Sequence, residues 1–313
     1  MKIAVLDDYQ NVALNMADWS SLMARAEVSV FNDHLADPEA VINRLAPFDV
    51  VCVMRERTPL PRGIIDRLPQ LKLIASTGPG NASIDTAAAK ERGIRVAHTG
   101  YRSTPTIEMT WAMILASARH LHTESASVRA GGWQTAVGEE LDGKTLGILG
   151  LGRVGGAVAR IGQAFGMKLI AWSQNMTAEA AEAAGALLVT KADLFRQSDF
   201  ITIHLVLSDR TRGLVGASDL ALMKPGARLI NTSRGPIVHE DALIQALKSK
   251  QIGGAALDVF DHEPLPLEHP YRALNNVLAT PHIGYVGEDL YRTFYGDVVN
   301  SISAWLDERA GAA

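Results

Sequence analysis

Short apolar runs alternate with longer segments of helical periodicity along almost the whole chain, and this alternation strongly limits the folds available. Most of the apolar runs are continuous rather than alternating, as parallel strands are when helices cover both faces of a sheet. The segments between them, such as 240–250, repeat apolar residues at helical spacing and end in lysines. The sequence therefore predicts a doubly wound α/β fold. The strand candidates are 2–6, 50–54, 71–76, 145–150, 168–172, 200–206, 227–232 and 254–259.

A long apolar helix is expected to follow residues 98–104, where the organisation of the chain changes. Thr104 should cap this helix, and Pro105 should occupy its first position, where a missing N–H does no harm. Glu108 would then lie in the first turn, near the positive end of the helix. The helix should run for about 15 residues and is more apolar than a surface helix requires. It fits either a core helix or one shared between domains or subunits.

Length and composition limit the classes of protein that fit. With 313 residues, the chain is long enough for two domains rather than one. A net charge of −4 gives no reason to expect nucleic acid or an anionic membrane as a partner. The N-terminal apolar run is too short for a signal peptide, and no run approaches the ~18–20 apolar residues of a membrane span. Cys52 is the only cysteine and is expected in the core rather than as a catalytic thiol. A cytoplasmic location is therefore expected, and no metal site is predicted.

A glycine pattern lies between an apolar run and a helical segment. Gly150, Gly152 and Gly155 form GxGxxG directly after the strand candidate 145–150. In a Rossmann unit the first glycine permits the tight turn, the second admits the pyrophosphate, and the third lets helix and strand pack closely. The phosphates then lie at the helix N-terminus. With a strand before it and a helix after it, the pattern indicates dinucleotide binding rather than a purely structural turn.

The choice of dinucleotide depends on the end of the next strand candidate, where an acidic residue usually holds the adenosine ribose. Ser173 occupies this place, 18 residues after Gly155, and Gln174 and Asn175 follow it. A serine removes the charge that would repel a 2′-phosphate, yet no adjacent arginine could bind one. The sequence is therefore compatible with use of both NAD and NADP. The alternative is that Gln174 and Asn175 hydrogen-bond the ribose of NAD alone.

Three later segments carry polar residues where parallel strands should end, the edge at which such folds bind ligands. They supply Arg234, Glu263 and His282. Arg234 could hold both oxygens of a carboxylate, and His282 could give a proton to a carbonyl oxygen or take one back. Glu263 could orient the imidazole ring. Each residue alone also fits a structural role, as a core histidine, a loop arginine or a turn glutamate.

With these residues the chain resembles the D-isomer-specific 2-hydroxyacid dehydrogenase family over essentially its whole length. The resemblance is carried by 71–96, by 141–159, by 222–236 and by "TPHIG" at 280–284. It implies hydride transfer between NAD(P)H and a small 2-oxo acid or D-2-hydroxy acid. It assigns the same roles to the three residues: Arg234 binds the carboxylate, His282 is the acid/base and Glu263 orients it.

The resemblance also implies a set of cofactor-binding residues beyond the glycine loop. Asp258 would receive the nicotinamide carboxamide, although a strand-end carboxylate that caps a turn is an alternative. The other implied cofactor residues are Arg153, Val154, Ser173, Gln174, Asn175, His204, Leu205, Thr211, Thr232, Ser233 and Gly284.

On the substrate side, the resemblance places the N–H groups of 77–81 near the substrate carboxylate, with Thr77, Gly78 and Gly80 as contacts. Arg55 could reach a distal group of the substrate, or it could belong to a solvated loop. The sequence departs from the family pattern at 82–83, at Val206 and at Gly287, positions that shape the pocket wall rather than the hydride chemistry.

The resemblance implies that a Rossmann dinucleotide-binding domain, 98–283, is inserted into a discontinuous flavodoxin-like substrate domain, 1–97 with 284–313. It also implies a homodimer formed through the dinucleotide-binding domain, and the chain is expected to lack a C-terminal regulatory domain. Two other functions stay open. One is phosphoglycerate dehydrogenase, for which Arg55 and Arg57 are the evident phosphate-binding candidates. The other is a non-catalytic NAD-sensing binding protein.

Overall fold

The chain forms two compact units. The computed structural model describes residues 1–311, in which unit 1 comprises Met1–Arg102 with the segment from Val286 onward, and unit 2 comprises Ser103–Tyr285. The chain therefore enters unit 2 after Arg102 and leaves it after Tyr285. Both points lie later than the boundaries expected from the sequence, by five and two residues.

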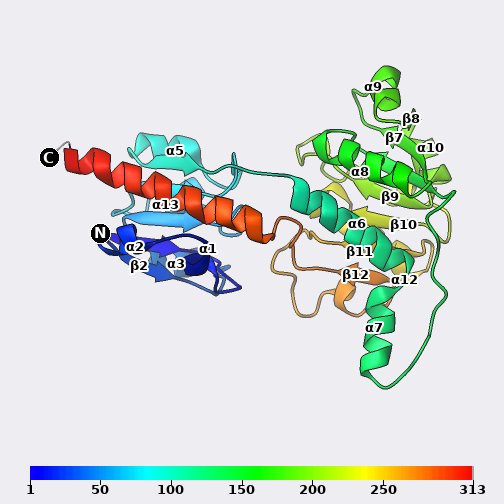
Figure 1. Ribbon diagram of the computed structural model, residues 1–313, viewed down its shortest axis with the longest axis horizontal. Helices are drawn as coiled ribbons and strands as arrows, with labels where there is room; N and C mark the ends of the chain where they lie inside the picture. Colours follow the sequence, from blue (N-terminus) through cyan, green and yellow to red (C-terminus); the bar gives the residue numbers. More distant parts are fainter. Residues whose placement is uncertain (312–313) are drawn as a thin grey trace. The chain divides into compact units, whose positions relative to one another are not determined.

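Unit 1 is built on a five-stranded parallel sheet in the order β2-β1-β3-β4-β5, and its strands are coloured blue to cyan in Figure 1. This is the flavodoxin-like order expected from the sequence. Helices α3, α4 and α5 pack together, whereas α13 packs against α1, α2, β4 and β5. The strands are β1 (Lys2–Val5), β2 (Glu27–Val30), β3 (Val50–Val53), β4 (Leu73–Ser76) and β5 (Arg95–His98). The helices are α1 (Ala13–Met16), α2 (Ser20–Met23), α3 (Pro38–Leu45), α4 (Arg62–Ile65), α5 (Thr86–Glu91) and α13 (Glu288–Gly311).

Unit 2 is built on a seven-stranded parallel sheet in the order β12-β11-β10-β9-β6-β7-β8. Counted from β6, the first six strands follow the dinucleotide-binding order 3-2-1-4-5-6, and β12 extends the sheet by one strand. The predicted fold class is thus confirmed. The strands are β6 (Thr145–Leu149), β7 (Lys168–Trp172), β8 (Leu187–Leu188), β9 (Phe200–Ile203), β10 (Arg228–Asn231), β11 (Gly254–Leu257) and β12 (Val277–Ala279).

Helices cover both faces of this sheet, and neighbouring strand residues enter different cores. In β10, Leu229 belongs to one buried cluster and Ile230 to the other. This double burial explains why the strands read as continuous apolar runs in the sequence. The helices are α6 (Thr104–Ala118), α7 (Leu121–Arg129), α8 (Arg153–Ala164), α9 (Ala178–Ala183), α10 (Lys191–Gln197), α11 (Ala217–Leu220) and α12 (Glu240–Lys248), with short 3-10 turns at Gly235–Ile237 and Pro270–Arg272.

The expected long helix is present as α6 with the predicted length of 15 residues, but it starts one residue earlier than predicted. Ser103, not Thr104, is the N-cap residue, and its side chain makes no capping hydrogen bond. Pro105 is therefore the second helical residue, and no acidic side chain lies in the first turn, so the placement of Glu108 was wrong. The helix ends at Ala118 because His120 adopts a left-handed conformation (φ +51°), after which α7 begins.

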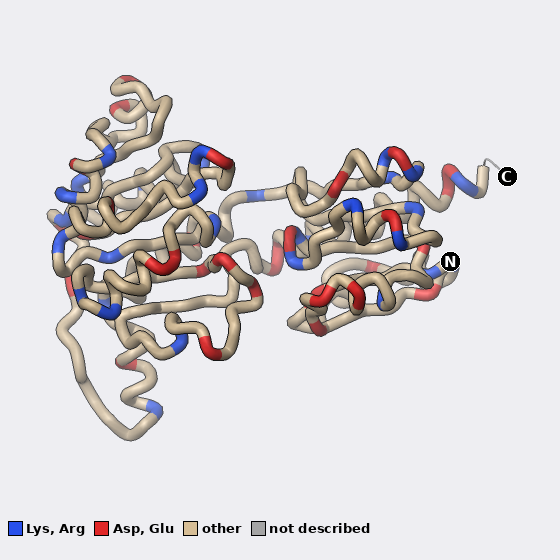
Figure 2. Tube along the Cα trace, turned by 180° about the vertical axis from the view of Figure 1, so that it is seen from behind, with Lys and Arg blue, Asp and Glu red and all other residues tan. Residues whose placement is uncertain are grey.

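Charged residues of both signs are interspersed over the two units, without a continuous stretch of one sign (Figure 2). Within residues 1–311, no helix combines the length and apolar character needed to cross a membrane. The same residues contain no group of three or more His, Cys, Asp or Glu side chains arranged to hold a metal ion.

Candidate active site

The glycine loop links the end of β6 to the start of α8 through a close backbone contact. Gly150 has a positive φ of +94°, and a Cβ atom on Gly155 would lie 2.0 Å from the Gly150 carbonyl oxygen. Only glycine permits this approach of helix and loop. A Cβ atom on Gly152, by contrast, would meet nothing within 4 Å. Protein atoms therefore fill the space next to Gly155, whereas the space next to Gly152 is empty of protein atoms.

The N-terminus of α8 lies at this open side of the loop. The helix begins at Arg153, its first regular bond runs from the Gly156 N–H to the Gly152 carbonyl at 2.7 Å, and Gly152 provides no side-chain cap. The N–H groups of Arg153 and Val154 precede that bond and have no acceptor within the helix. Together with the helix dipole, they form an end of the helix that favours an anion.

The segment after β7 contains the three residues considered for the ribose. Ser173 is half-buried, Gln174 and Asn175 are exposed, and a turn closes from the Met176 N–H to the Ser173 carbonyl at 3.2 Å. No carboxylate occurs in this turn.

Arg234 lies in the turn that follows β10, and two contacts fix this turn. The Ser233 hydroxyl donates to the Leu205 carbonyl at 2.5 Å, which ties the turn to the segment after β9. A Cβ atom on Gly235 would lie 2.1 Å from the carbonyl carbon of Phe260. Because glycine occupies position 235, the Arg234 turn packs directly on the backbone that leads to Glu263.

Glu263 and His282 form a hydrogen-bonded pair. One carboxylate oxygen of Glu263 accepts from the Phe260 N–H at 2.9 Å, and the other lies 2.5 Å from His282 Nδ1. Both side chains keep access to solvent, with 33% and 24% of their area exposed. The ring of Tyr285 stands edge-on to the imidazole at 5.4 Å. No hydrogen bond among the described residues engages His282 Nε2, so this nitrogen is left to exchange a proton.

Asp258 holds the backbone around His282. His282 adopts a left-handed conformation (φ +51°), which costs a non-glycine residue on the order of 1–3 kcal/mol. The Asp258 carboxylate is fully buried and accepts from the Thr280 hydroxyl at 2.6 Å and from the N–H groups of Ile283 and Gly284 at 2.9 and 2.7 Å. Burial raises the pKa of this carboxyl. These contacts agree with the alternative of a strand-end carboxylate that caps a turn.

The remaining residues expected at the cofactor lie in unit 2, and several are engaged within it. Burial lowers the pKa of His204 to about 3, so the ring stays neutral; its Nε2 lies 3.0 Å from the Thr202 hydroxyl. The Thr211 hydroxyl donates to the Val206 carbonyl at 2.7 Å, a hydrogen bond within the loop that follows β9. The Thr232 hydroxyl is buried against that of Thr110 in α6, at 2.8 Å. The side chains of Thr211 and Thr232, both predicted to contact the cofactor, therefore have hydrogen-bond partners within unit 2.

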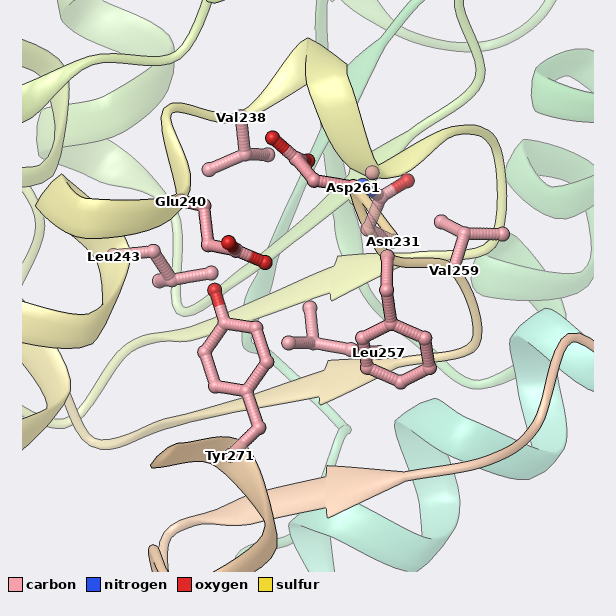
Figure 3. A pocket seen from close by; sticks show the side chains of 10 residues that line it. Asn231, Val238, Glu240, Leu243, Leu257, Val259, Asp261 and Tyr271 are labelled. Carbon is pink, nitrogen blue, oxygen red and sulfur yellow. The ribbon is translucent and has the colours of Figure 1, made fainter. Parts of the chain in front are cut away.

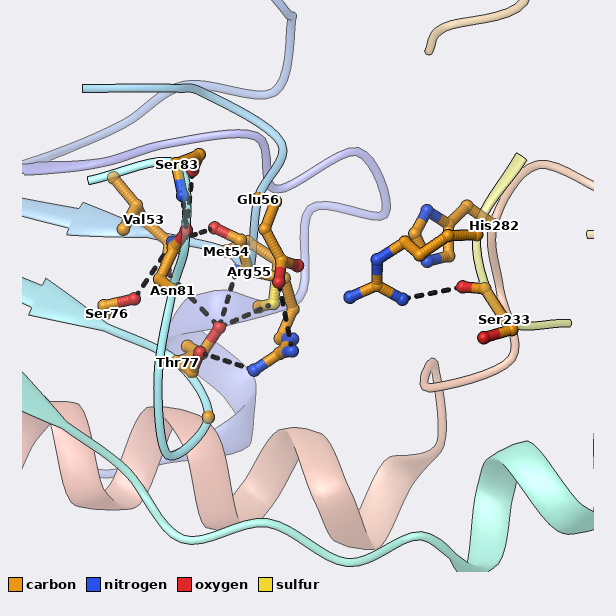
Figure 4. A network of polar contacts seen from close by, with 12 residues as sticks. Val53, Met54, Arg55, Glu56, Ser76, Thr77, Asn81, Ser83, Ser233 and His282 are labelled. Atoms are coloured by element: carbon orange, nitrogen blue, oxygen red, sulfur yellow. Dashed lines mark hydrogen bonds and ion pairs between the residues drawn. The ribbon is translucent and has the colours of Figure 1, made fainter. Parts of the chain in front are cut away.

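The candidate substrate residues lie at the carboxyl ends of β3 and β4 in unit 1 (Figure 4). Arg55 donates through Nη1 to the Thr77 carbonyl at 3.2 Å, and its backbone N–H donates to the Thr77 hydroxyl at 2.8 Å. The N–H groups of Thr77 and Gly78 donate to the Val53 carbonyl and to the Thr99 hydroxyl, at 3.1 and 2.7 Å. Among the described residues, no hydrogen bond uses the N–H groups of Gly80 and Asn81. Of the N–H groups in 77–81, these two remain available to a ligand.

The sequence and the fold are both similar to those of known proteins. The family described as "D-isomer specific 2-hydroxyacid dehydrogenase, NAD binding domain" matches residues 111–284, all of which lie in unit 2. The glyoxylate reductase of Aeropyrum pernix is 44% identical over 229 residues, which cover 70% of this chain and 68% of the relative. The chain belongs to the D-isomer specific 2-hydroxyacid dehydrogenase family. The crystal structure of the phosphoglycerate oxidoreductase of Vibrio cholerae is similar to this chain, with a TM-score of 0.93 and 36% identity, covering 98% of this chain and 99% of the other.

Some curated relatives in the 2-hydroxyacid dehydrogenase family are much longer. The D-3-phosphoglycerate dehydrogenase of Synechocystis is 38% identical over 304 residues, which are 96% of this chain but 53% of that protein. The chain therefore spans about half the length of this relative.

The glycine loop of unit 2 fits the nicotinamide dinucleotide that this family uses. The space in front of Gly152 is open, while Gly155 is in contact with the loop backbone. The free N–H groups at the start of α8 suit a pyrophosphate. A helix N-terminus that receives no side-chain cap from its own chain is consistent with a cap supplied by a ligand.

Two asparagines, one in each unit next to predicted site residues, were not singled out from the sequence. Asn231 ends β10, and Asn81 donates to the Arg55 carbonyl at 2.6 Å and to the Ser76 hydroxyl at 3.2 Å. An asparagine directly after an apolar strand and before a turn is typical of a side chain that bonds its own backbone. That local signal was available for Asn231 in "LINTSRG".

Proposed function

We propose that this dehydrogenase-family chain catalyses hydride transfer between a nicotinamide dinucleotide and a small 2-oxo acid or D-2-hydroxy acid. The observation that carries the proposal is the contact of 2.5 Å between His282 Nδ1 and Glu263, which leaves Nε2 as the proton-exchanging atom. A ring held in this way presents one nitrogen with a defined tautomer, as general acid–base chemistry requires.

Three residues of the chain would have separate roles in this reaction. Arg234 would hold the substrate carboxylate through a forked pair of hydrogen bonds. His282 Nε2 would donate a proton to the carbonyl oxygen during reduction, and it would take the proton back from the hydroxyl during oxidation. Glu263 would hold the ring by its other nitrogen. When bound, the nicotinamide dinucleotide supplies or accepts the hydride.

For the cofactor, Gly152 and the N–H groups of Arg153 and Val154 would hold the pyrophosphate. Ser173 would face the adenosine ribose, with Gln174 and Asn175 beside it. Since none of these side chains is anionic, nothing in this turn repels a 2′-phosphate, which supports use of both NAD and NADP. A kcat/KM for NADH that exceeds that for NADPH by more than about a thousandfold, some 4 kcal/mol, would contradict this dual use.

For the substrate, the arrangement of unit 1 favours a small unphosphorylated 2-oxo acid such as glyoxylate or hydroxypyruvate. Arg57, one of two arginines considered for a phosphate, donates to the Asp7 carbonyl at 2.6 Å and to the Tyr291 hydroxyl at 3.3 Å. Its guanidinium also lies over the Tyr9 ring at 4.4 Å. Arg57 is thus engaged within unit 1, which weakens the case for phosphoglycerate as the substrate.

The test is the loss of NADH or NADPH absorbance with glyoxylate, hydroxypyruvate, pyruvate and phenylpyruvate, and the reverse reaction with 3-phosphoglycerate. Turnover with an unphosphorylated 2-oxo acid is the expected result, together with a large rise in KM for that acid in Arg234→Ala. Cofactor binding with no turnover on any of these acids would instead favour the non-catalytic NAD-sensing alternative.

We also propose that the chain forms a homodimer through unit 2. Four large apolar side chains are exposed on α7 and on the segment that follows it, and a second copy would remove their apolar surface from water. They are Leu121, Val128, Trp133 and Val137, with 53, 57, 74 and 94% of their area exposed.

A further inference from the structure

We propose that Asn231 is a positioning residue that sets the conformation of the turn carrying Arg234. The proposal rests on the proposed function only in that Arg234 is taken to bind the substrate carboxylate. Asn231 is the last residue of β10 and is 1% exposed.

Both ends of the Asn231 amide are used by the turn that follows it. Its Nδ2 donates to the Arg234 carbonyl at 2.9 Å, and its Oδ1 accepts from the Ser233 N–H at 3.0 Å. The side chain is therefore hydrogen-bonded to the backbone of the turn at both Ser233 and Arg234.

These two hydrogen bonds fix the backbone of Arg234 and hence the point from which its side chain extends. Arg234 has an extended backbone (φ −148°, ψ 136°), whereas the next three residues, Gly235–Ile237, form a 3-10 turn. The change from extended to helical backbone thus occurs directly after the residue that Asn231 holds by its carbonyl. Since Arg234 Nη1 also bonds back to the Ser233 carbonyl at 2.7 Å, the whole turn is closed on itself.

The surroundings of Asn231 limit which other side chains fit at position 231. Its side chain lines a small cavity together with Glu240, Asp261 and Tyr271 (Figure 3). The cavity holds about 10 Å³, room for roughly one water molecule. A larger side chain does not fit there, and a smaller one would leave both the Arg234 carbonyl and the Ser233 N–H without their partner.

Asn231→Asp is the sharpest variant because it keeps the shape of the side chain. The acceptor for the Ser233 N–H remains, while the donor to the Arg234 carbonyl is replaced by an oxygen. We expect KM for glyoxylate to rise about tenfold or more, consistent with the loss of one buried hydrogen bond. The dissociation constant for NADH, measured by fluorescence titration, should stay unchanged, which also shows that unit 2 is folded. Asn231→Ala serves as a second variant without a buried charge.

A matched control is Asn276→Ala. Asn276 lies just before β12, and its Nδ2 donates to the Leu247 carbonyl at 3.1 Å, so the variant loses a similar bond in the same unit. Its KM for glyoxylate should equal that of the parent protein. Equal rises in KM for the Asn276 and Asn231 variants would show a general loss of stability and would overturn the proposal.

A double-mutant cycle separates this proposal from the proposed function. If Asn231 acts through Arg234, then Asn231→Ala should add little to the rise in KM already caused by Arg234→Ala. Additive effects would overturn the positioning role while leaving Arg234 as the carboxylate ligand. No effect of Arg234→Ala itself would instead refute the proposed function.

Discussion

His282 combines two features that a proton-transferring residue needs. Its Nδ1 is held by Glu263 at 2.5 Å, and its backbone is held in an unfavourable left-handed conformation by the buried Asp258. A ring fixed by contacts at both levels has little freedom to turn away from a substrate. Its position is therefore determined by its contacts with Glu263 and by the contacts of Asp258 with the neighbouring backbone.

Replacing His282 by Gln should lower kcat by about 10² to 10⁴ because the proton donor is lost. NADH affinity should not change, since the glycine loop is untouched. Steady-state kinetics and fluorescence titration measure the two quantities. His262→Gln is the control, because His262 is exposed and lies next to Glu263 in the same segment. Near-full activity of the His282 variant would contradict its role.

His204 makes a second residue-level prediction, on stability against pH. Burial lowers the pKa of this ring from 6.5 to about 3, so the folded protein leaves it neutral where the unfolded chain protonates it. The free energy of unfolding should therefore decrease as pH falls from about 6.5 towards 3, by up to about 1.4 kcal/mol per unit. Urea unfolding of the cofactor-free protein across this range measures the slope. His204→Gln should show a shallower slope, and an identical slope would be evidence against the burial of a neutral ring.

At the scale of elements, the two adjacent glycines in the first turns of α8 have different tasks. Gly155 contacts the loop backbone, whereas a Cβ atom on Gly156 would meet only the Leu151 carbonyl oxygen at 3.9 Å, an ordinary contact. The helix thus needs one of the two as glycine and tolerates a side chain at the other.

Gly155→Ala should move α8 away from the loop and weaken NADH binding about tenfold or more, because the phosphate-facing N–H groups shift with the helix. Gly156→Ala should bind NADH normally and be more stable, since alanine favours the helix by up to about 1 kcal/mol. Titration calorimetry and thermal unfolding test both variants. Equal affinities would show that the close contact does not position the helix.

The strands also show how far the sequence could predict the fold. All eight strand candidates are present as β1, β3, β4, β6, β7, β9, β10 and β11. The strands that the sequence analysis did not name are β2, β5, β8 and β12, which are the edges of the two sheets as described for residues 1–311. An edge strand is covered less completely, so exposed and half-buried positions predominate in these four strands, with Val277 in β12 as the one buried residue, and they give no continuous apolar run.

The sequence predicted some features of the candidate site and not others. Residue type and position at strand ends predicted the Glu263–His282 pair, because the carboxyl ends of parallel strands meet at one edge. The internal partners of Thr232 and Asp258 were not predictable in this way. They depend on contacts with α6 and with the turn after β12, which spacing along one segment does not reveal.

At the scale of the whole molecule, each unit has a hydrophobic core of its own. The apolar residues exposed on α7 and beyond it belong to neither core. The chain keeps them at the surface of unit 2, where a second copy is the partner expected from the proposed homodimer.

Sedimentation velocity should therefore show a dimer at micromolar concentration. The double variant Trp133→Ser, Val137→Ser should shift the equilibrium towards monomer by removing apolar contact area. Leu187→Ser is the control, because Leu187 is 65% exposed in the same unit but lies on the edge strand β8. A parent chain that sediments as a monomer would refute the homodimer.

The insertion of unit 2 as one uninterrupted stretch, 103–285, has a consequence for how this enzyme family can diversify. The residues proposed to bind the cofactor and to move the proton lie inside that stretch, and Arg55 and the loop 77–81 lie outside it. Mutations in the two regions can accumulate separately, so preference for a new acid can arise without rebuilding the redox chemistry. A recombination event with two crossovers, one near each junction, would exchange the reaction machinery as a single inherited block.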